Sequence, residues 1–330
     1  PYNPATTVIR YFAYKMIFKY NKQSQIYFVF LNVIQRVFSM FQGSIVALVT
    51  PMTATGEFDA SRFRSLIETH IAAGTNAIVV LGTTGESPTI MDSERYRIIK
   101  LAVEVSAGRI PIIAGTGTNA TLSTIYETEQ AMELGVDACL IVTPYYNRPT
   151  QEGLYQHYRA VAEAVSIPIL LYNNPSRTGC DLLSETVVRL SHISNIIGIK
   201  DATGDLARCR ALVSVCDKKF NLLTGDDASA LAFMLQGGHG DISVTANVAP
   251  KLMNDMCAAA LLNKVQLAGE LNTRLMPLHK ALFVEPNPIP VKWAVQQLGL
   301  IEAGIRLPLT PLADQYHAIV REAMEVSGVI

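Results

Sequence analysis

Cysteine is scarce in this chain, and the spacing of its cysteines argues against the common cysteine-built sites. There are five of them, an odd number, and no two form a CxxC pair. Neither a disulfide framework nor a zinc site is therefore expected, and a reducing compartment such as the cytoplasm fits best. The six histidines show no metal-ligand spacing and no HExxH motif occurs, so we expect no metal and no cofactor.

Long apolar runs are also missing. The longest one near the N-terminus, residues 26–34, is interrupted by Asn32 and is far shorter than the roughly 20 residues that a membrane span needs. It lacks the small-residue cleavage site of a secretory signal. The formal net charge of −1 gives no overall attraction for nucleic acid or for an anionic membrane. We therefore expect neither as a partner.

Residues 1–39 contain no acidic side chain, yet they hold five cations and 10 of the 25 aromatic residues. An organelle transit peptide is one interpretation, although serine is scarce in the segment. The alternative is an extension that does no chemistry, because the regular pattern begins only at Met40. We expect the second, and treat residues 1–39 as lying outside the fold.

From residue 44 onward, short β-rich runs alternate with stretches that have room for an amphipathic helix, such as 61–73 and 93–105. Several runs are continuously apolar, as is typical of parallel strands covered on both faces. Eight evenly spaced units favour a closed (β/α)₈ TIM barrel over an open doubly wound sheet. The expected strands are Ser44–Thr50, Ala77–Leu81, Pro111–Gly115, Ala138–Thr143, Pro168–Tyr172, Ile196–Lys200, Asn221–Gly225 and Asp241–Thr245.

After Pro250 the strand pattern stops. Residues 251–282, 291–298 and 312–328 are expected to be helices separated by proline-containing breaks. The predicted organisation is therefore an extension over 1–39, a catalytic barrel over 40–250 and a C-terminal helical domain over 251–330.

Reactive and small residues gather where the strands end. The second strand runs into Gly82-Thr83-Thr84-Gly85-Glu86, the fifth ends in Tyr172, the sixth in Lys200 and the seventh in Gly225-Asp226. Barrel enzymes place their active sites at this carboxyl-terminal rim. The rim is therefore the predicted site.

Lys200 closes an apolar strand, so it is expected to project into the mouth of the barrel, partly removed from water. Desolvation favours the neutral amine, which can attack a carbonyl group. Tyr172 ends the neighbouring strand, and its phenol could relay the protons of imine chemistry. The alternatives are a strand-end lysine that reaches solvent and a rim tyrosine packed against a loop.

Two glycine-containing segments allow other interpretations. The turn 82–86 suits a small carboxylate or phosphate, or is a plain strand-to-helix turn, and it lacks the Gly-Lys-Ser/Thr of a P-loop. Gly115-x-Gly117-x-x-Ala120 resembles a dinucleotide fingerprint and would make the protein a nicotinamide-dependent oxidoreductase. Asp137 is at the right distance but precedes the fourth strand instead of ending it, which weakens that alternative.

Three segments together resemble the signatures of the dihydrodipicolinate synthase and N-acetylneuraminate lyase family. They are the turn 82–86, Tyr172-Asn173-Asn174-Pro175-Ser176-Arg177-Thr178-Gly179 and Gly198-Ile199-Lys200. The resemblance runs from about Met40 to the C-terminus. It implies a (β/α)₈ barrel with a C-terminal helical domain, in a homotetramer built as a dimer of dimers.

The resemblance also implies catalytic roles. Lys200 would form a Schiff base with pyruvate, and Tyr172 would be the proton donor and acceptor. Thr83 matches the threonine that links two tyrosines in a proton relay. Tyr146 matches the relay tyrosine that reaches across a subunit interface.

For the substrates, Thr84 and Ile242 match positions that line the pyruvate pocket, the threonine contacting the carboxylate. Arg177 matches the arginine that holds the carboxylate of (S)-aspartate 4-semialdehyde in the synthase branch. A guanidinium suits such a bidentate contact. The implied reaction condenses these two substrates on the way to lysine and diaminopimelate. A pyruvate aldolase acting on a keto-deoxy sugar acid, and a barrel that binds a small carboxylate without turnover, remain the alternatives.

Overall fold

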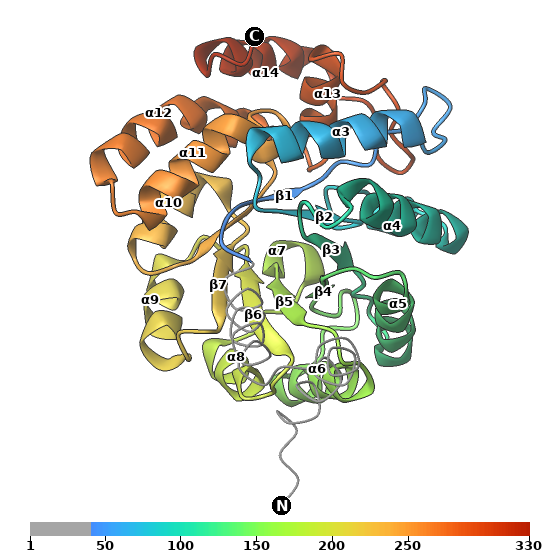
Figure 1. Cartoon of the computed structure of the whole chain (residues 1–330), viewed down its shortest axis with the longest axis vertical. Helices are drawn as coiled ribbons and strands as arrows, with labels where there is room; N and C mark the ends of the chain where they lie inside the picture. The colour runs from blue at the N-terminus through green and yellow to red at the C-terminus, as the bar shows by residue number, and fades with distance from the viewer. Residues whose placement is uncertain (1–40) are drawn as a thin grey trace, which may run out of the picture.

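The computed structural model describes residues 41–330, which form a closed barrel of eight parallel strands surrounded by helices (Figure 1). Each strand pairs with the next in the chain, and β8 pairs with β1. The strands are β1 Gly43–Ala47, β2 Ala77–Val80, β3 Ile112–Gly115, β4 Ala138–Val142, β5 Ile169–Asn173, β6 Ile196–Asp201, β7 Asn221–Thr224 and β8 Gly240–Ser243. The predicted fold class is confirmed.

The strands are apolar on both faces because both faces are buried. In β1, Ile45 and Ala47 point into the barrel interior, whereas Val46 packs in the layer between strands and helices. This alternation follows the two-residue period of a strand. It explains why the sequence shows continuous apolar runs in place of alternating ones.

Helices cover the outside of the barrel in chain order. Their ends follow local sequence: α3 begins after Asp59, whose carboxylate accepts hydrogen bonds from two backbone N–H groups, and ends at Gly74 in a left-handed conformation. The helices up to the eighth strand are α3 Ala60–Ala73, α4 Asp92–Ser106, α5 Thr121–Glu133, α6 Gln151–Ala164, α7 Pro175–Thr178, α8 Ser184–Ser191, α9 Leu206–Val215 and α10 Ala230–Leu235.

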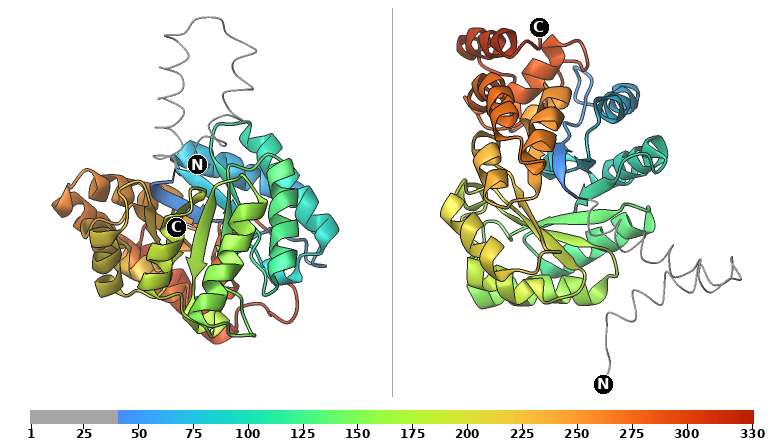
Figure 2. Two further views of the ribbon diagram at one scale, coloured as in Figure 1. Left: turned by 90° about the horizontal axis from the view of Figure 1, so that it is seen from below. Right: turned by 60° about the vertical axis from the view of Figure 1, so that its left-hand side comes forward.

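Four more helices follow β8, namely α11 Pro250–Leu261, α12 Val265–Ala281, α13 Ile289–Gln297 and α14 Asp314–Val326. The single helix expected over 251–282 is wrong, because the chain breaks at 262–264, where Asn263 has a φ of 55°. Asparagine tolerates this left-handed conformation, and one such residue ends a helix. Helices α12, α13 and α14 gather at one end of the molecule (Figures 1 and 2).

The predicted domain boundary at residue 250 stays a prediction. Helix α11 contacts β1, α3 and α10, so it completes the ring of helices around the barrel. We therefore propose that the barrel unit extends to Leu261. The predicted extension over residues 1–39 lies outside the described residues. Within 41–330, no helix is long and apolar enough to cross a membrane.

Candidate active site

Lys200 and Tyr172 lie side by side at the carboxyl-terminal rim of the barrel. They are register partners on β6 and β5, and the Lys200 Nζ is 4.5 Å from the centre of the Tyr172 ring. Each residue is only 6 % exposed. The alternatives of a solvent-reaching lysine and of a tyrosine packed only on a loop are therefore excluded. An amine and a phenol thus meet at a position where both are buried.

The Tyr172 hydroxyl has two partners, one directly after its own strand and one in the turn 82–86. The side-chain amide of Asn174 donates to it at 3.0 Å, and Thr83 is a second hydrogen-bond partner. Burial raises the pKa of Tyr172, but the charge of Lys200 and these two hydrogen bonds lower it, and the net shift is downward. A lowered pKa makes the phenol a better proton donor and brings it closer to neutral pH, which favours acid–base catalysis.

Gly225, directly after β7, makes room for the lysine. A Cβ at this position would lie 2.4 Å from Cε of Lys200, so the lysine side chain would have to shift if this residue were not glycine. The alkyl chain of Lys200 therefore runs along the backbone of Gly225. The sequence showed this glycine at the strand end but did not show its purpose.

Thr84 and Arg177, both predicted to bind substrate, are joined through Asn287. The Asn287 amide donates to the Thr84 hydroxyl at 3.0 Å, and its main-chain oxygen accepts from the Arg177 guanidinium at 2.9 Å. Thr84 is buried, while Arg177 is exposed at the barrel mouth. Asn287 was missed by sequence reasoning, which took residues 285–290 only as a break between helices.

The turn 82–86 is anchored to the C-terminal part of the chain by a buried carboxylate, that of Glu86. Glu86 is 1 % exposed, forms an ion pair with Lys292 of α13 and accepts the backbone N–H of Arg306 at 3.2 Å. Burial lowers the pKa of Lys292 while Glu86 raises it, with a net downward shift. Arg306 in turn forms an ion pair with Glu94 of α4. Helix α13 and the segment that follows it thus hold the turn that carries Thr84.

The remaining predicted residues lie in two different places. Ile242 is fully buried in the barrel interior, in the same apolar cluster as Tyr172. Tyr146 is 89 % exposed and its side chain projects from the loop after β4. The structure thus places Tyr172 beside Lys200 and Thr83, and it joins Thr84 to Arg177 through Asn287.

The two glycines of the dinucleotide-like motif and the acidic residue that follows β7 have structural explanations. A Cβ at Gly115 would lie 2.2 Å from a backbone oxygen, and one at Gly117 would lie 2.4 Å from a backbone nitrogen, so close packing accounts for both glycines. Asp226 caps the short helix 227–229 by accepting from the backbone of Ser229 at 3.1 Å. Among residues 41–330, no group of three or more His, Cys, Asp or Glu side chains could hold a metal ion.

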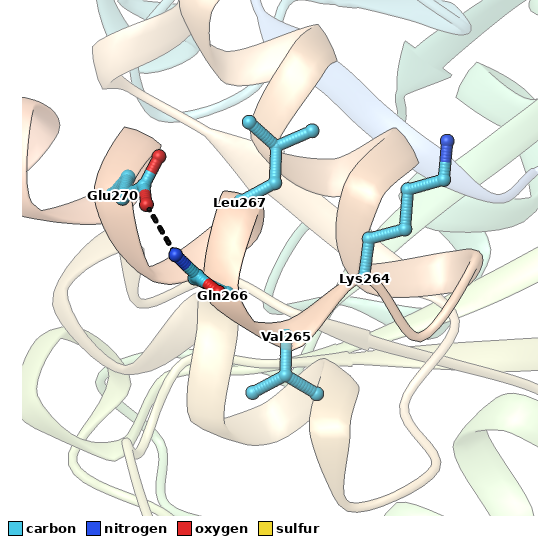
Figure 3. Close-up of a pocket in the computed structure, with 5 residues that line it drawn as sticks. All are labelled: Lys264, Val265, Gln266, Leu267 and Glu270. Atoms are coloured by element: carbon cyan, nitrogen blue, oxygen red, sulfur yellow. Dashed lines mark hydrogen bonds between the residues drawn. The ribbon is translucent and has the colours of Figure 1, made fainter.

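A surface hollow of about 410 Å³ lies at the start of α12, lined by residues 264–267 and Glu270 (Figure 3). Gln266 and Glu270 hydrogen bond to each other along the helix at 3.1 Å. None of the rim residues lines this hollow.

Comparison with known proteins agrees with this geometry. The sequence model of the Dihydrodipicolinate synthetase family matches residues 40–326. The 4-hydroxy-tetrahydrodipicolinate synthase of Nitrosospira multiformis is 58% identical over 87% of this chain and 96% of its own length. The same-named protein of Pseudomonas aeruginosa is 56% identical over 88% of this chain and 100% of its own length.

Two solved structures are also similar. The chloride-inhibited dihydrodipicolinate synthase of Acinetobacter baumannii, complexed with pyruvate, superposes with a TM-score of 0.87 at 54% identity, over 88% of this chain and 99% of that one. A monomeric dihydrodipicolinate synthase variant superposes with a TM-score of 0.86 at 42% identity, over 89% and 99%.

Proposed function

The chain belongs to the dihydrodipicolinate synthetase family, and we infer that it is a lyase that condenses pyruvate with (S)-aspartate 4-semialdehyde. This is the activity of a 4-hydroxy-tetrahydrodipicolinate synthase, a step of lysine and diaminopimelate biosynthesis. The observation that carries the inference is the buried pair of Lys200 and Tyr172 at the rim. A barrel that only binds a carboxylate would not need this pair.

Lys200 is the proposed nucleophile. Its neutral amine attacks C2 of pyruvate, a C–N bond forms and the carbonyl π electrons move to oxygen. The oxygen takes a proton from Tyr172, which regains one from the nitrogen. The hydroxyl group then leaves with a further proton as water, and the imine remains. One amine and one ketone thus give one imine and one water, with no cofactor.

Thr83 is proposed to pass protons to and from Tyr172, since it is a hydrogen-bond partner of that hydroxyl. Thr84 and Ile242 are proposed to hold pyruvate, one through its hydroxyl and the other through its apolar side chain. Arg177 is proposed to bind the carboxylate of the aldehyde. Its place at the mouth supports this, because the second substrate must approach an imine that already fills the interior.

Reduction with borohydride tests the mechanism. Enzyme incubated with pyruvate and borohydride should gain a reduced pyruvyl group on Lys200, located by mass spectrometry of the peptides. Lys200→Ala should gain none, and Lys292, which is also buried but paired with Glu86, should stay unmodified in both. An adduct on another lysine, or activity without any adduct, would contradict the Schiff-base mechanism.

We also propose a homotetramer, a dimer of dimers, in which Tyr146 completes the proton relay of the partner subunit. The exposure of Tyr146 supports this, because its side chain is free to contact a second subunit. The cytoplasm is the proposed location, since all five cysteines are free thiols.

A further inference from the structure

Two adjacent asparagines at the end of β5 have different partners. Asn173 is fully buried, and its amide donates to Asp181 at 2.8 Å and to Asp201 at 3.0 Å, which fixes the loop that follows. The amide of Asn174 has a different partner, the hydroxyl of Tyr172 at 3.0 Å. The first asparagine serves the fold, whereas the second contacts the proton-transfer group.

The side chain of Asn174 is held on both sides. The Ser176 hydroxyl donates to its Oδ1 at 2.8 Å, which leaves the NH₂ group facing the phenol. Pro175 follows and disfavours a helical backbone at Asn174, whose φ is −145° and ψ is 80°. The main-chain oxygen of Asn174 accepts from the Thr178 hydroxyl at 3.1 Å. The amide is therefore positioned before any substrate arrives.

We propose that Asn174 is a positioning residue of the proton-transfer step, which holds the Tyr172 oxygen in place through its amide N–H. The proposal rests on the proposed function, in which Tyr172 moves the proton. A phenol oxygen that accepts from Asn174 has its own hydrogen directed elsewhere, toward Thr83 or the reacting oxygen. The hydrogen bond thus fixes both the position of the hydroxyl oxygen and the direction of its hydrogen.

The same contact changes the acidity of the phenol. An N–H donor stabilises the phenolate, so its removal raises the pKa of Tyr172. The other groups that face Tyr172 remain in place: the charges of Lys200 on β6 and Arg177 on α7, and the hydroxyl of Thr83. Tyr158 of α6 contacts only the backbone of Tyr172. The change is therefore expected to isolate the contribution of one hydrogen bond.

Asn174→Leu, similar in size but without a donor, tests the proposal. Its kcat should fall roughly 3- to 10-fold, the size of one lost hydrogen bond, with the KM for pyruvate changed less than about twofold. The pKa of Tyr172 should rise by roughly 0.5–1 unit. It is measured by ultraviolet titration of tyrosinate, with the Tyr172→Phe curve subtracted. Asn174→Asp should raise the pKa further, because a carboxylate then faces the phenolate.

The control is Asn195→Leu. The side-chain amide of Asn195 donates to the main-chain oxygens of Ala162 and Val165 and does not contact Tyr172. Its loss should leave the Tyr172 titration unchanged. If Asn174→Leu does not fold, Ser176→Ala decides, since it frees the amide to rotate and should give a smaller shift in the same direction. An unshifted titration in these variants overturns the proposal.

Borohydride trapping in the same samples separates this proposal from the proposed function. Trapping on Lys200 together with an unshifted Tyr172 means that the Schiff-base mechanism stands and the role of Asn174 is wrong. No trapping in the unaltered enzyme means that the proposed function itself fails. A role confined to folding would reduce the yield or stability of Asn174→Leu without moving the titration.

Discussion

Arg177 occupies a four-residue helix at the mouth of the barrel, where the main-chain oxygen of Asn287 holds its guanidinium. We expect Arg177→Ala to raise the KM for the aldehyde far more than that for pyruvate. A charge-assisted hydrogen bond contributes roughly 1.5–3 kcal/mol, or about 10- to 150-fold in binding. Steady-state kinetics with each substrate varied in turn measure the two effects.

Arg148→Ala is the matched control, because Arg148 is an exposed neighbour that bonds only the backbone of Gly179. It should change neither constant by more than about twofold. Equal losses for both substrates in Arg177→Ala would mean that Arg177 organises the site and does not select the aldehyde.

The sequence predicted the neighbours of some site residues but not of others. Lys200 and Tyr172 end consecutive strands of a predicted barrel, so their adjacency followed from the topology and is confirmed. Asn287 contacts Thr84 across 203 positions of the chain. No spacing rule predicts such a contact, because it depends on how the C-terminal helices pack.

At the level of elements, the expected strands lie within about three residues of the observed ones, since uninterrupted apolar runs have clear ends. The break between α11 and α12 was not foreseen. Asparagine is common within helices as well as at their ends, and only its backbone angle shows which applies here.

The turn 82–86 is joined to α13 by the buried ion pair of Glu86 and Lys292. Lys292→Met should destabilise the protein by about 3–5 kcal/mol, because it leaves a buried carboxylate without its cation. Urea unfolding, followed by circular dichroism, measures this change. Combining it with Glu86→Gln removes both charges and should recover most of the loss.

Lys251→Met provides the comparison, since Lys251 and Asp255 form an ion pair on the surface of α11. Its cost should stay below about 1 kcal/mol, as for exposed pairs in general. A double variant no more stable than Lys292→Met alone would show that the unpaired carboxylate of Glu86 is not the cause of the loss.

For the whole molecule, the exposed Tyr146 predicts that sites are shared between subunits. Lys200→Ala and Tyr146→Phe chains should each have little activity alone. If Tyr146 serves the partner's site, a hybrid dimer contains one complete site. Equal mixing, with unfolding and refolding together, should then restore about a quarter of the wild-type activity by random pairing.

Mixing without subunit exchange is the control and should restore nothing. Sedimentation of the unaltered enzyme gives the oligomeric state in the same experiment. A monomer, or hybrids that stay inactive, would contradict a shared site. In that outcome the role of Tyr146 must be sought within its own chain.

The ion pair between Glu86 and Lys292 also bears on how the enzyme becomes active during its own synthesis. A ribosome delivers the N-terminal residues first, at roughly 5–20 residues per second. All eight strands have been delivered by Ser243, yet Lys292 and Arg306 come later. Until then Glu86 lacks both of its partners, and the turn that carries Thr84 has only its contacts within the barrel, such as the Thr50 hydroxyl that donates to the main-chain oxygen of Gly85. A growing chain can therefore complete its barrel well before it can begin catalysis.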